Sequence, residues 1–299
     1  MEKLNTYEMI RDAILEALDK GVIPWKSGFT AGDGKGPRSY NGRPYRGINV
    51  WLLNLRGYND PRWITFKQAK KLGGQVRKGE KGTFITFWKW LQVEKEDDLG
   101  NTKLQTIPML KRYHVFNVEQ CDGLTGDGEA LKPWIVDDEK LPEWYVITQA
   151  ESVAANIPNP PSISYDSPNV PYYRPGTDSI HLPARETFHN SESFYETLFH
   201  ELSHSTGHKS RLDRKMGVAR FGSHDYGVEE LVAEFSTAYV TGVIGLGLED
   251  IENKAAYIAS WKKAIKADAK LVTHAAQRAQ KSADYILNVE ADKQTKQSS

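Results

Sequence analysis

Residues 198–208 read Leu-Phe-His-Glu-Leu-Ser-His-Ser-Thr-Gly-His, and the centre of this stretch is the motif His200-Glu201-Leu202-Ser203-His204. Helical residues four positions apart lie one turn apart on the same face, so both imidazoles can reach one cation. Glu201 follows the first histidine, where its carboxylate can take a proton from a metal-bound water. The stretch therefore predicts a helix over residues 193–208 that carries two metal ligands and a general base.

The third metal ligand has to come from another part of the chain. Position 210 holds Ser210, whereas the related pattern H-E-x-x-H-x-x-G-x-x-H requires a histidine there. Downstream, Glu230 and Glu234 are spaced four residues apart on a second expected helix. Glu230 could bind the metal while Glu234 orients a ligand histidine from behind. Glu229 is the rival ligand, because spacing alone does not separate two adjacent glutamates.

The expected ligand set also indicates which cations fit. Two histidines and one glutamate are typical of a catalytic zinc site, and they accept Mn²⁺ as the alternative. Tyr226 precedes the glutamates and is a candidate hydrogen-bond donor to a tetrahedral oxyanion. The sequence thus predicts one divalent metal, with Zn²⁺ as the first expectation.

Composition narrows the class of protein. The chain has 299 residues, which favours two domains, and its 39% hydrophobic and 26% charged residues exclude collagen-like and wholly disordered classes. No apolar run approaches the length of a membrane span, and the first twenty residues do not resemble a signal peptide. A single cysteine, Cys121, excludes an internal disulfide and a cysteine-based zinc finger. We therefore expect a cytoplasmic protein.

Charge is distributed unevenly along the chain. The stretch from Lys20 to Lys89 holds 15 basic and three acidic residues, although the whole chain has 39 of each. The remainder of the chain is correspondingly acidic. Two parts of opposite charge indicate two functions.

The basic stretch is also rich in aromatic residues, many of which adjoin a cation. Lysine and arginine neutralise phosphates, and flat rings stack on unpaired bases, which a duplex hides. The pattern predicts a single-stranded DNA interface and disfavours a membrane surface, which would need a basic amphipathic helix. The alternative is an aromatic core under a basic surface, and Trp51, Phe66 and Phe84 are the rings expected in a core. The expected DNA contacts are Trp25, Lys26, Arg38, Tyr40, Arg43, Tyr45, Arg46, Asn49, Trp63, Lys67, Lys78, Lys81, Trp88 and Lys89.

Hydrophobic periodicity outlines the secondary structure. Asn5 with Glu8, and Thr65 with Gln68, predict capping boxes at two helix starts. A polar segment over residues 95–103 is expected to form a hairpin or a long connection between two strands. Helices are expected over residues 4–18, 48–55, 65–71, 193–208, 228–240 and 251–286, and strands over 83–93, 111–118 and 179–183.

Several segments resemble one known family, the ArdC antirestriction proteins. In its N-terminal single-stranded-DNA-binding domain the similar segments are Pro24-Trp25-Lys26, Tyr45-Arg46-Gly47-Ile48-Asn49, Trp63-Ile64-Thr65-Phe66-Lys67-Gln68-Ala69 and Val76-Arg77-Lys78-Gly79-Glu80-Lys81-Gly82. Residues 200–214 and 229–234 are similar to the zincin-type metallopeptidase domain of the same family. The resemblance covers roughly residues 4–285, and the combination is more specific than either motif alone.

The resemblance implies an α+β fold of two domains. A small α+β domain that binds single-stranded DNA is expected at residues 1–125, a linker at 126–140, and a mainly helical zincin-like metallopeptidase domain at 141–299. ArdC-like proteins are carried by plasmids and phages, and they protect incoming DNA from host restriction. The implied partners are single-stranded DNA and a protein substrate, for which a host restriction component is one candidate. The alternative is a single-stranded-DNA-binding protein whose metal site is structural or proteolytically inactive.

Overall fold

The computed structural model describes residues 5–25, 36–96, 102–126, 129–130, 143–168, 170–214, 224–246 and 254–289. Helix α1 (Thr6–Asp19) begins the described chain, and Asn5 and Glu8 form its capping box, as predicted. Helix α3 (Phe66–Lys71) begins with the second predicted capping box, formed by Thr65 and Gln68. Between them lies α2 (Ile48–Asn54), whose first six residues are all buried.

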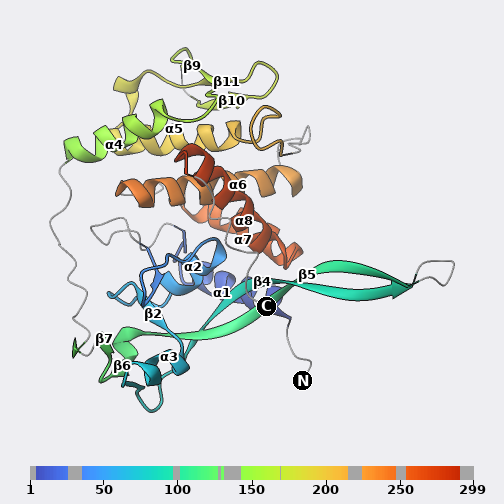
Figure 1. The fold of residues 1–299 in the computed structure, drawn as a ribbon. Helices are drawn as coiled ribbons and strands as arrows, with labels where there is room; N and C mark the ends of the chain where they lie inside the picture. The colour runs from blue at the N-terminus through green and yellow to red at the C-terminus, as the bar shows by residue number, and fades with distance from the viewer. Residues whose placement is uncertain are drawn as a thin grey trace.

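A four-stranded sheet joins these helices, with the strand order β1-β2-β5-β4. Strands β1 (Arg38–Ser39) and β2 (Arg62–Ile64) are parallel, and β5 (Thr102–Asn117) runs antiparallel to both β2 and β4 (Thr83–Glu96). The pairing of β4 with β5 forms a long ribbon that extends beyond the rest of the molecule (Figure 1). Strand β4 continues to Glu96 and β5 begins at Thr102, so both strands of the expected hairpin are longer than predicted. Leu104, Gln105 and Thr106 are exposed in β5, so this part of the ribbon needs no alternation of apolar residues.

The C-terminal part is mainly helical. Helix α4 (Glu143–Ala155) leads to a three-stranded sheet of order β10-β11-β9. The expected helix over 251–286 is two helices, because the chain turns at 268–270, where the Lys270 N–H donates to Asp268 Oδ1 (2.8 Å). The remaining elements are β9 (Ser162–Ser164), β10 (Tyr172–Arg174), β11 (Ser179–His181), α5 (Ser191–Ser205), α6 (His224–Ile244), α7 (Lys254–Ala267) and α8 (Leu271–Ile286).

Short elements complete the described chain. Part of the segment expected as a linker at 126–140 forms a small hairpin, in which β7 pairs with β8, and residues 127–128 and 131–140 lie outside the described residues. Within the described part of the chain, none of the helices has the length and apolar character needed to cross a bilayer. The short elements are β3 (Gln75–Val76), β6 (Cys121–Asp122), β7 (Thr125–Gly126), β8 (Glu129–Ala130), η1 (Val118–Gln120) and η2 (Arg185–Thr187).

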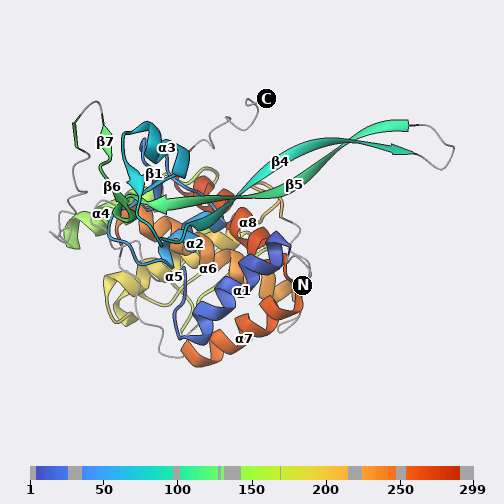
Figure 2. The same cartoon turned by 90° about the horizontal axis from the view of Figure 1, so that it is seen from below.

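The main hydrophobic core contains side chains from both ends of the chain. Helix α6 is at its centre and packs against α5, α7 and α8 (Figures 1 and 2). The Trp51 ring of α2 stacks on Tyr239 of α6, with 4.6 Å between centroids. Trp25 packs between Phe235 and Trp261, at 4.7 and 5.1 Å. The α+β, two-domain expectation is confirmed, and the two domains share one core.

The burial of Trp25 generates the first prediction. Its side chain is fully buried, so Trp25→Ala leaves a large cavity between the two domains. We expect the variant to lose about 3–5 kcal/mol of unfolding free energy in urea denaturation. The variant Phe66→Ala is the control, because that ring is 49% exposed. Equal stability of the wild type and Trp25→Ala would contradict the shared core.

Candidate metal centre

Helix α5 presents its two histidines on the face that α6 covers. Asn190 caps the helix through the Ser193 N–H (2.8 Å), and the apolar side chains Phe199 and Leu202 are fully buried on the other side. The His200 and His204 rings lie nearly perpendicular, at 80°, with centroids 4.8 Å apart. The predicted spacing of four residues therefore brings the two imidazoles together.

Glu230 on α6 completes a cluster of three ligand atoms. The two Nε2 atoms of His200 and His204 lie 3.1 Å apart, and each lies 3.5 Å from an oxygen of the Glu230 carboxylate. Among the described residues, His200, His204 and Glu230 are the histidine and carboxylate set whose ligand atoms gather within 4.8 Å of one another. Each of the three side chains is partly exposed, so a cation has access to them.

These separations fit a tetrahedral cation. Ligand atoms about 2.0–2.2 Å from a zinc ion at tetrahedral angles are separated by about 3.3 Å. The Nε2 atoms lie 3.1 Å apart, and each lies 3.5 Å from a different oxygen of Glu230, so these nearest separations are close to that value. Two imidazole nitrogens and one carboxylate oxygen also match the donor set of catalytic zinc sites, which leave a fourth position open.

The adjacent carboxylates contact the opposite nitrogens of the two rings. Glu234 Oε1 lies 4.0 Å from His200 Nδ1, and Glu229 Oε1 lies 3.7 Å from His204 Nδ1. A carboxylate in this position orients the ring and fixes which nitrogen carries the proton. Glu230 thus faces the Nε2 atoms, whereas Glu229 and Glu234 lie behind the rings.

Arg214 holds Glu229 in this position. One of its terminal nitrogens lies 2.5 Å from Glu229 Oε1 and 2.8 Å from the Ser203 carbonyl oxygen. The other donates to Thr206 Oγ1 at 2.5 Å. Burial raises the pKa of Glu229, but the His204 ring and the Arg214 guanidinium outweigh this and hold the pKa below its usual value. Arg214 therefore ties the loop after α5 to both helices of the centre.

The carboxylates also act on His200. Burial lowers the pKa of its imidazole, but Glu230, Glu234 and Glu201 together outweigh burial and raise it to about 9. The metal-free cluster thus favours a positive charge between its carboxylates. A cation bound there would take the place of that proton.

The expected general base lies next to the ligands. Glu201 follows His200 on α5, and only 5% of its surface is exposed. The backbone of Tyr226 lies in α6, but its side chain is outside the described residues. The structure thus places the catalytic candidate Glu201 at the centre.

A second arginine joins the centre to the small sheet. Arg211 Nε donates to the Ser205 carbonyl oxygen (2.7 Å) at the end of α5, and its guanidinium pairs with Asp178. Tyr173 of β10 donates to the same carboxylate at 2.8 Å. The sheet β9–β11 is therefore fixed beside α5.

Three of the residues predicted to bind DNA are buried, and these predictions were wrong. Trp25 is fully buried in the main core, and Trp63 is 2% exposed in a small cluster with Leu53. The Asn49 side chain pairs with the Thr86 backbone, donating to its carbonyl oxygen and accepting from its N–H, both at 2.8 Å. A base or phosphate has no access to these groups.

The other predicted DNA contacts lie nearer the surface. Arg46 forms an ion pair with Asp284 of α8, although 43% of its side chain is exposed. Burial raises the pKa of the half-buried Tyr45 to about 12. Lys26 lies outside the described residues. Half-buried side chains are Arg38, Tyr40, Tyr45 and Trp88, and exposed ones are Arg43, Arg46, Lys67, Lys78, Lys81 and Lys89.

Some functional candidates were missing from the sequence prediction. Arg214 gave no signal beyond its place in the basic segment that follows the metal motif. The prediction that Phe66 is a core ring was wrong, because it is 49% exposed with the Lys70 ammonium 5.6 Å from its centroid. Phe87 and Tyr113 are also exposed. Basic residues near both rings in the sequence were the signal that could have identified them as surface residues.

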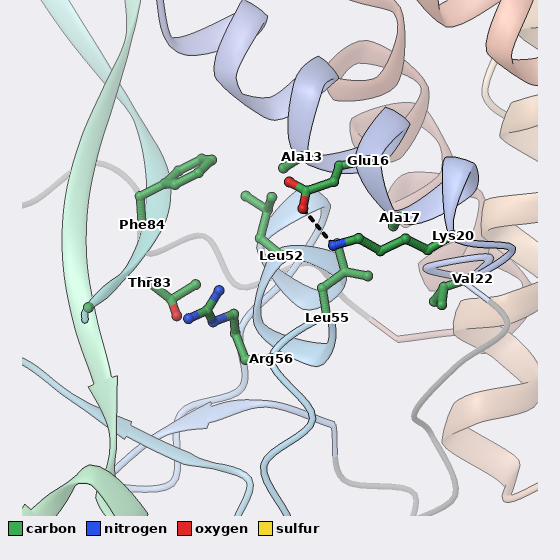
Figure 3. A pocket seen from close by; sticks show the side chains of 11 residues that line it. Ala13, Glu16, Ala17, Lys20, Val22, Leu52, Leu55, Arg56, Thr83 and Phe84 are labelled. Atoms are coloured by element: carbon green, nitrogen blue, oxygen red, sulfur yellow. Dashed lines mark hydrogen bonds and ion pairs between the residues drawn. The ribbon is translucent and has the colours of Figure 1, made fainter. Parts of the chain in front are cut away.

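A pocket of about 290 Å³ lies in another part of the molecule, between α1, α2 and β4 (Figure 3). Its walls are mainly apolar and include Leu52, Leu55 and Phe84, and the Glu16–Lys20 ion pair (2.6 Å) lies beside it. None of its lining residues belongs to α5 or α6. The pocket is therefore separate from the metal centre.

Comparison with protein families matches the two parts of the chain separately. Residues 4–116 match the family model described as the N-terminal domain of anti-restriction factor ArdC. Residues 150–278 match the model described as a zincin-like metallopeptidase. Together they cover most of the helices, nearly all of the ribbon and the three candidate ligands.

Individual relatives match over nearly the whole chain. The Mn(II)-bound crystal structure of the antirestriction ArdC protein from the R388 plasmid is 36% identical, with a TM-score of 0.71, over 97% of this chain and all of that one. An uncharacterized protein y4eC of Sinorhizobium fredii is 31% identical over 97% of this chain and 94% of its own length. Two DNA primase TraC proteins of Escherichia coli are 38% and 35% identical over 95% of this chain, which spans 20% and 27% of their lengths.

The contacts of Arg214 generate the second prediction. Without its guanidinium, Glu229 no longer has a fixed position behind His204, so the ligand ring loses its orientation. We expect Arg214→Ala to lower Zn²⁺ affinity about 10–100-fold in calorimetric titration of the metal-free protein. Arg174→Ala is the matched control, because among the described residues its guanidinium contacts only the nearby Tyr172 hydroxyl and ring. Unchanged affinity in Arg214→Ala would show that Glu229 needs no such anchor.

Proposed function

Because the chain belongs to the ArdC family of antirestriction proteins, with an ArdC N-terminal domain followed by a zincin-like metallopeptidase domain, we propose that it protects incoming DNA from restriction by two linked activities. One activity is metal-dependent hydrolysis of a protein at the centre on α5 and α6. The other is binding of single-stranded DNA by the N-terminal domain.

The convergence of His200, His204 and Glu230 is the observation that carries the peptidase proposal. Its ligand atoms all lie within 4.8 Å of one another, and the H-E-x-x-H motif on a helix is typical of metallopeptidases. Zn²⁺ is the proposed cation on the basis of this donor set, and Mn²⁺ is the alternative, supported by the Mn(II)-bound relative.

In the proposed mechanism each side chain has a separate task. His200, His204 and Glu230 would hold the cation, which would act as a Lewis acid on the scissile carbonyl and lower the pKa of a water molecule. The Glu201 carboxylate accepts a proton from the attacking water and returns it to the leaving amine. Glu229 and Glu234 keep the Nδ1 side of each imidazole fixed, so that Nε2 faces the cation.

Glu201 also separates the two functional alternatives. A purely structural metal site needs ligands that close the coordination sphere, and it needs no additional carboxylate beside them. Here the buried carboxylate of Glu201 lies next to three partly exposed candidate ligands. This arrangement supports catalysis over the alternative of a structural or inactive site.

The third prediction tests this assignment. Glu201→Gln keeps all three ligands, so we expect it to retain Zn²⁺ while cleavage of a protein probe such as casein falls about 10²–10⁴-fold. Metal content by mass spectrometry is the control for an intact site. A variant that cleaves as fast as the wild type would refute the role of Glu201.

The same variant tests whether peptidase activity serves antirestriction. If protection depends on proteolysis, cells with Glu201→Gln protein lose the protection of incoming DNA that the wild type gives. Protection that survives in the variant favours the alternative, in which the protein acts by occupying single-stranded DNA.

DNA binding is supported by the cations that the N-terminal domain leaves at the surface. Arg43, Lys67, Lys78 and Lys81 are exposed, and exposed rings lie in the same domain. Cations that attract phosphates, together with rings that stack on bases, favour an unpaired strand over a duplex.

The fourth prediction concerns the DNA-binding activity. We expect the affinity of the full chain for a labelled oligo-dT strand to fall steeply with added salt. The reason is that lysine and arginine side chains displace counterions from the phosphates that they bind. Unlabelled single strands should compete better than a duplex of the same length. Competition measured by fluorescence anisotropy decides this, and a preference for duplex would contradict the proposal.

A further inference from the structure

The ribbon formed by β4 and β5 has two faces of different character. It extends from the body in both views, and no other labelled element lies beside its outer part (Figures 1 and 2). Paired residues of an antiparallel ribbon share a face, and the faces alternate along each strand. Phe87 pairs with Lys111 and Lys89 pairs with Met109 on one face, whereas Trp88 with Leu110 and Trp90 with Pro108 occupy the other.

The second of these faces is partly covered by the body. The Trp88 ring lies 6.5 Å from the Tyr7 ring of α1, and Thr6 Oγ1 lies 3.5 Å from the Leu110 carbonyl oxygen. Phe84, which shares this face, packs against the main core together with Leu110. Near the base of the ribbon, this face therefore packs against the body of the protein.

At the base of the first face, Ile85 and Val115 are buried in a small cluster. Beyond this base the first face is open. The next residues outward form what we call the ribbon face: Phe87, Lys89, Met109, Lys111 and Tyr113. Phe87 and Tyr113 are each 48% exposed, and Met109 is 41% exposed. The two rings meet edge to face at 5.7 Å, so each supports the other in a fixed orientation.

The charge of the ribbon face is positive. Its two lysines have no acidic residue opposite or adjacent on the same face between residues 83–93 and 105–115. Within the part of the chain that the structure describes, neither lysine takes part in an ion pair. Half-exposed rings thus lie between cations that no described carboxylate neutralises.

We propose that the ribbon face is a contact site for single-stranded DNA, in which Phe87 and Tyr113 stack on bases while Lys89 and Lys111 neutralise phosphates. This inference rests on the proposed DNA-binding function and gives it a location. Rings with one open side and adjacent cations are the two elements that bind unpaired strands without sequence preference. Tyr45, a predicted DNA contact, packs against the same small cluster and so borders the ribbon face.

Two other occupants fit the ribbon face less well. A symmetric pairing of two copies through this face would bring the lysines of both copies together without a compensating carboxylate. An anionic membrane would attract the same lysines, but a two-stranded ribbon is not the amphipathic helix that inserts into a bilayer surface. Single-stranded DNA satisfies both the charge and the rings.

The test uses the full chain and a fluorescein-labelled oligo-dT strand in dilute buffer. Phe87→Ala/Tyr113→Ala removes both rings, and we expect binding to weaken at least about tenfold. Trp90→Ala/Leu104→Ala is the matched control, since it removes exposed apolar side chains, 59% and 68% exposed, from the opposite face. Lys89→Gln/Lys111→Gln should lower the slope of log affinity against log salt by about 1.4, since each phosphate contact contributes about 0.7.

The possible outcomes separate this inference from the function on which it rests. Binding by the wild type that both ring and lysine variants retain would overturn the ribbon face and leave the proposed DNA binding intact. A wild type that does not bind would overturn both. Equal losses of DNA affinity in the ring variant and in its control would also overturn the assignment. So would variants that lose only self-association, or only binding to anionic phosphatidylserine vesicles. Melting temperatures confirm that each variant is folded.

Discussion

The metal centre depends on the close packing of helices α5 and α6, because two of its ligand side chains lie on one helix and the third on the other. Small side chains allow this approach, since Ala233 of α6 and Ser203 of α5 are fully buried. The hydroxyls of Thr206 and Ser236 both lie 2.8 Å from that of Ser282 on α8, so the polar groups in this tight contact are paired. A larger side chain would separate the helices and move the carboxylate away from the imidazoles.

The centre also gathers several negative charges, which a cation would balance. Four carboxylates, from Glu201, Glu229, Glu230 and Glu234, surround two imidazoles, and like charges at such short range oppose one another. Arg214 compensates one carboxylate from the loop side. A divalent ion would compensate the others, so folding of this region and metal binding favour each other.

Local patterns predicted which side chains lie together at the candidate centre, and they failed where burial depends on distant contacts. The H-E-x-x-H spacing and the two capping boxes act within one turn of helix, so the sequence alone could place them. Trp25 and Trp63 adjoin cations in the sequence, but that pattern says nothing about the core into which each ring folds. The contacts of Arg214 with Ser203 and Glu229 likewise depend on the path of a loop, which no periodicity records.

The shared core has a consequence for how this protein can be inherited. Because Trp25 and Trp51 pack against Phe235, Tyr239 and Trp261, cutting the chain between its halves would expose this apolar surface on both of them. Recombination that exchanged either half alone would generate unstable products that aggregate, and selection would remove them. The two halves should therefore be inherited as one unit.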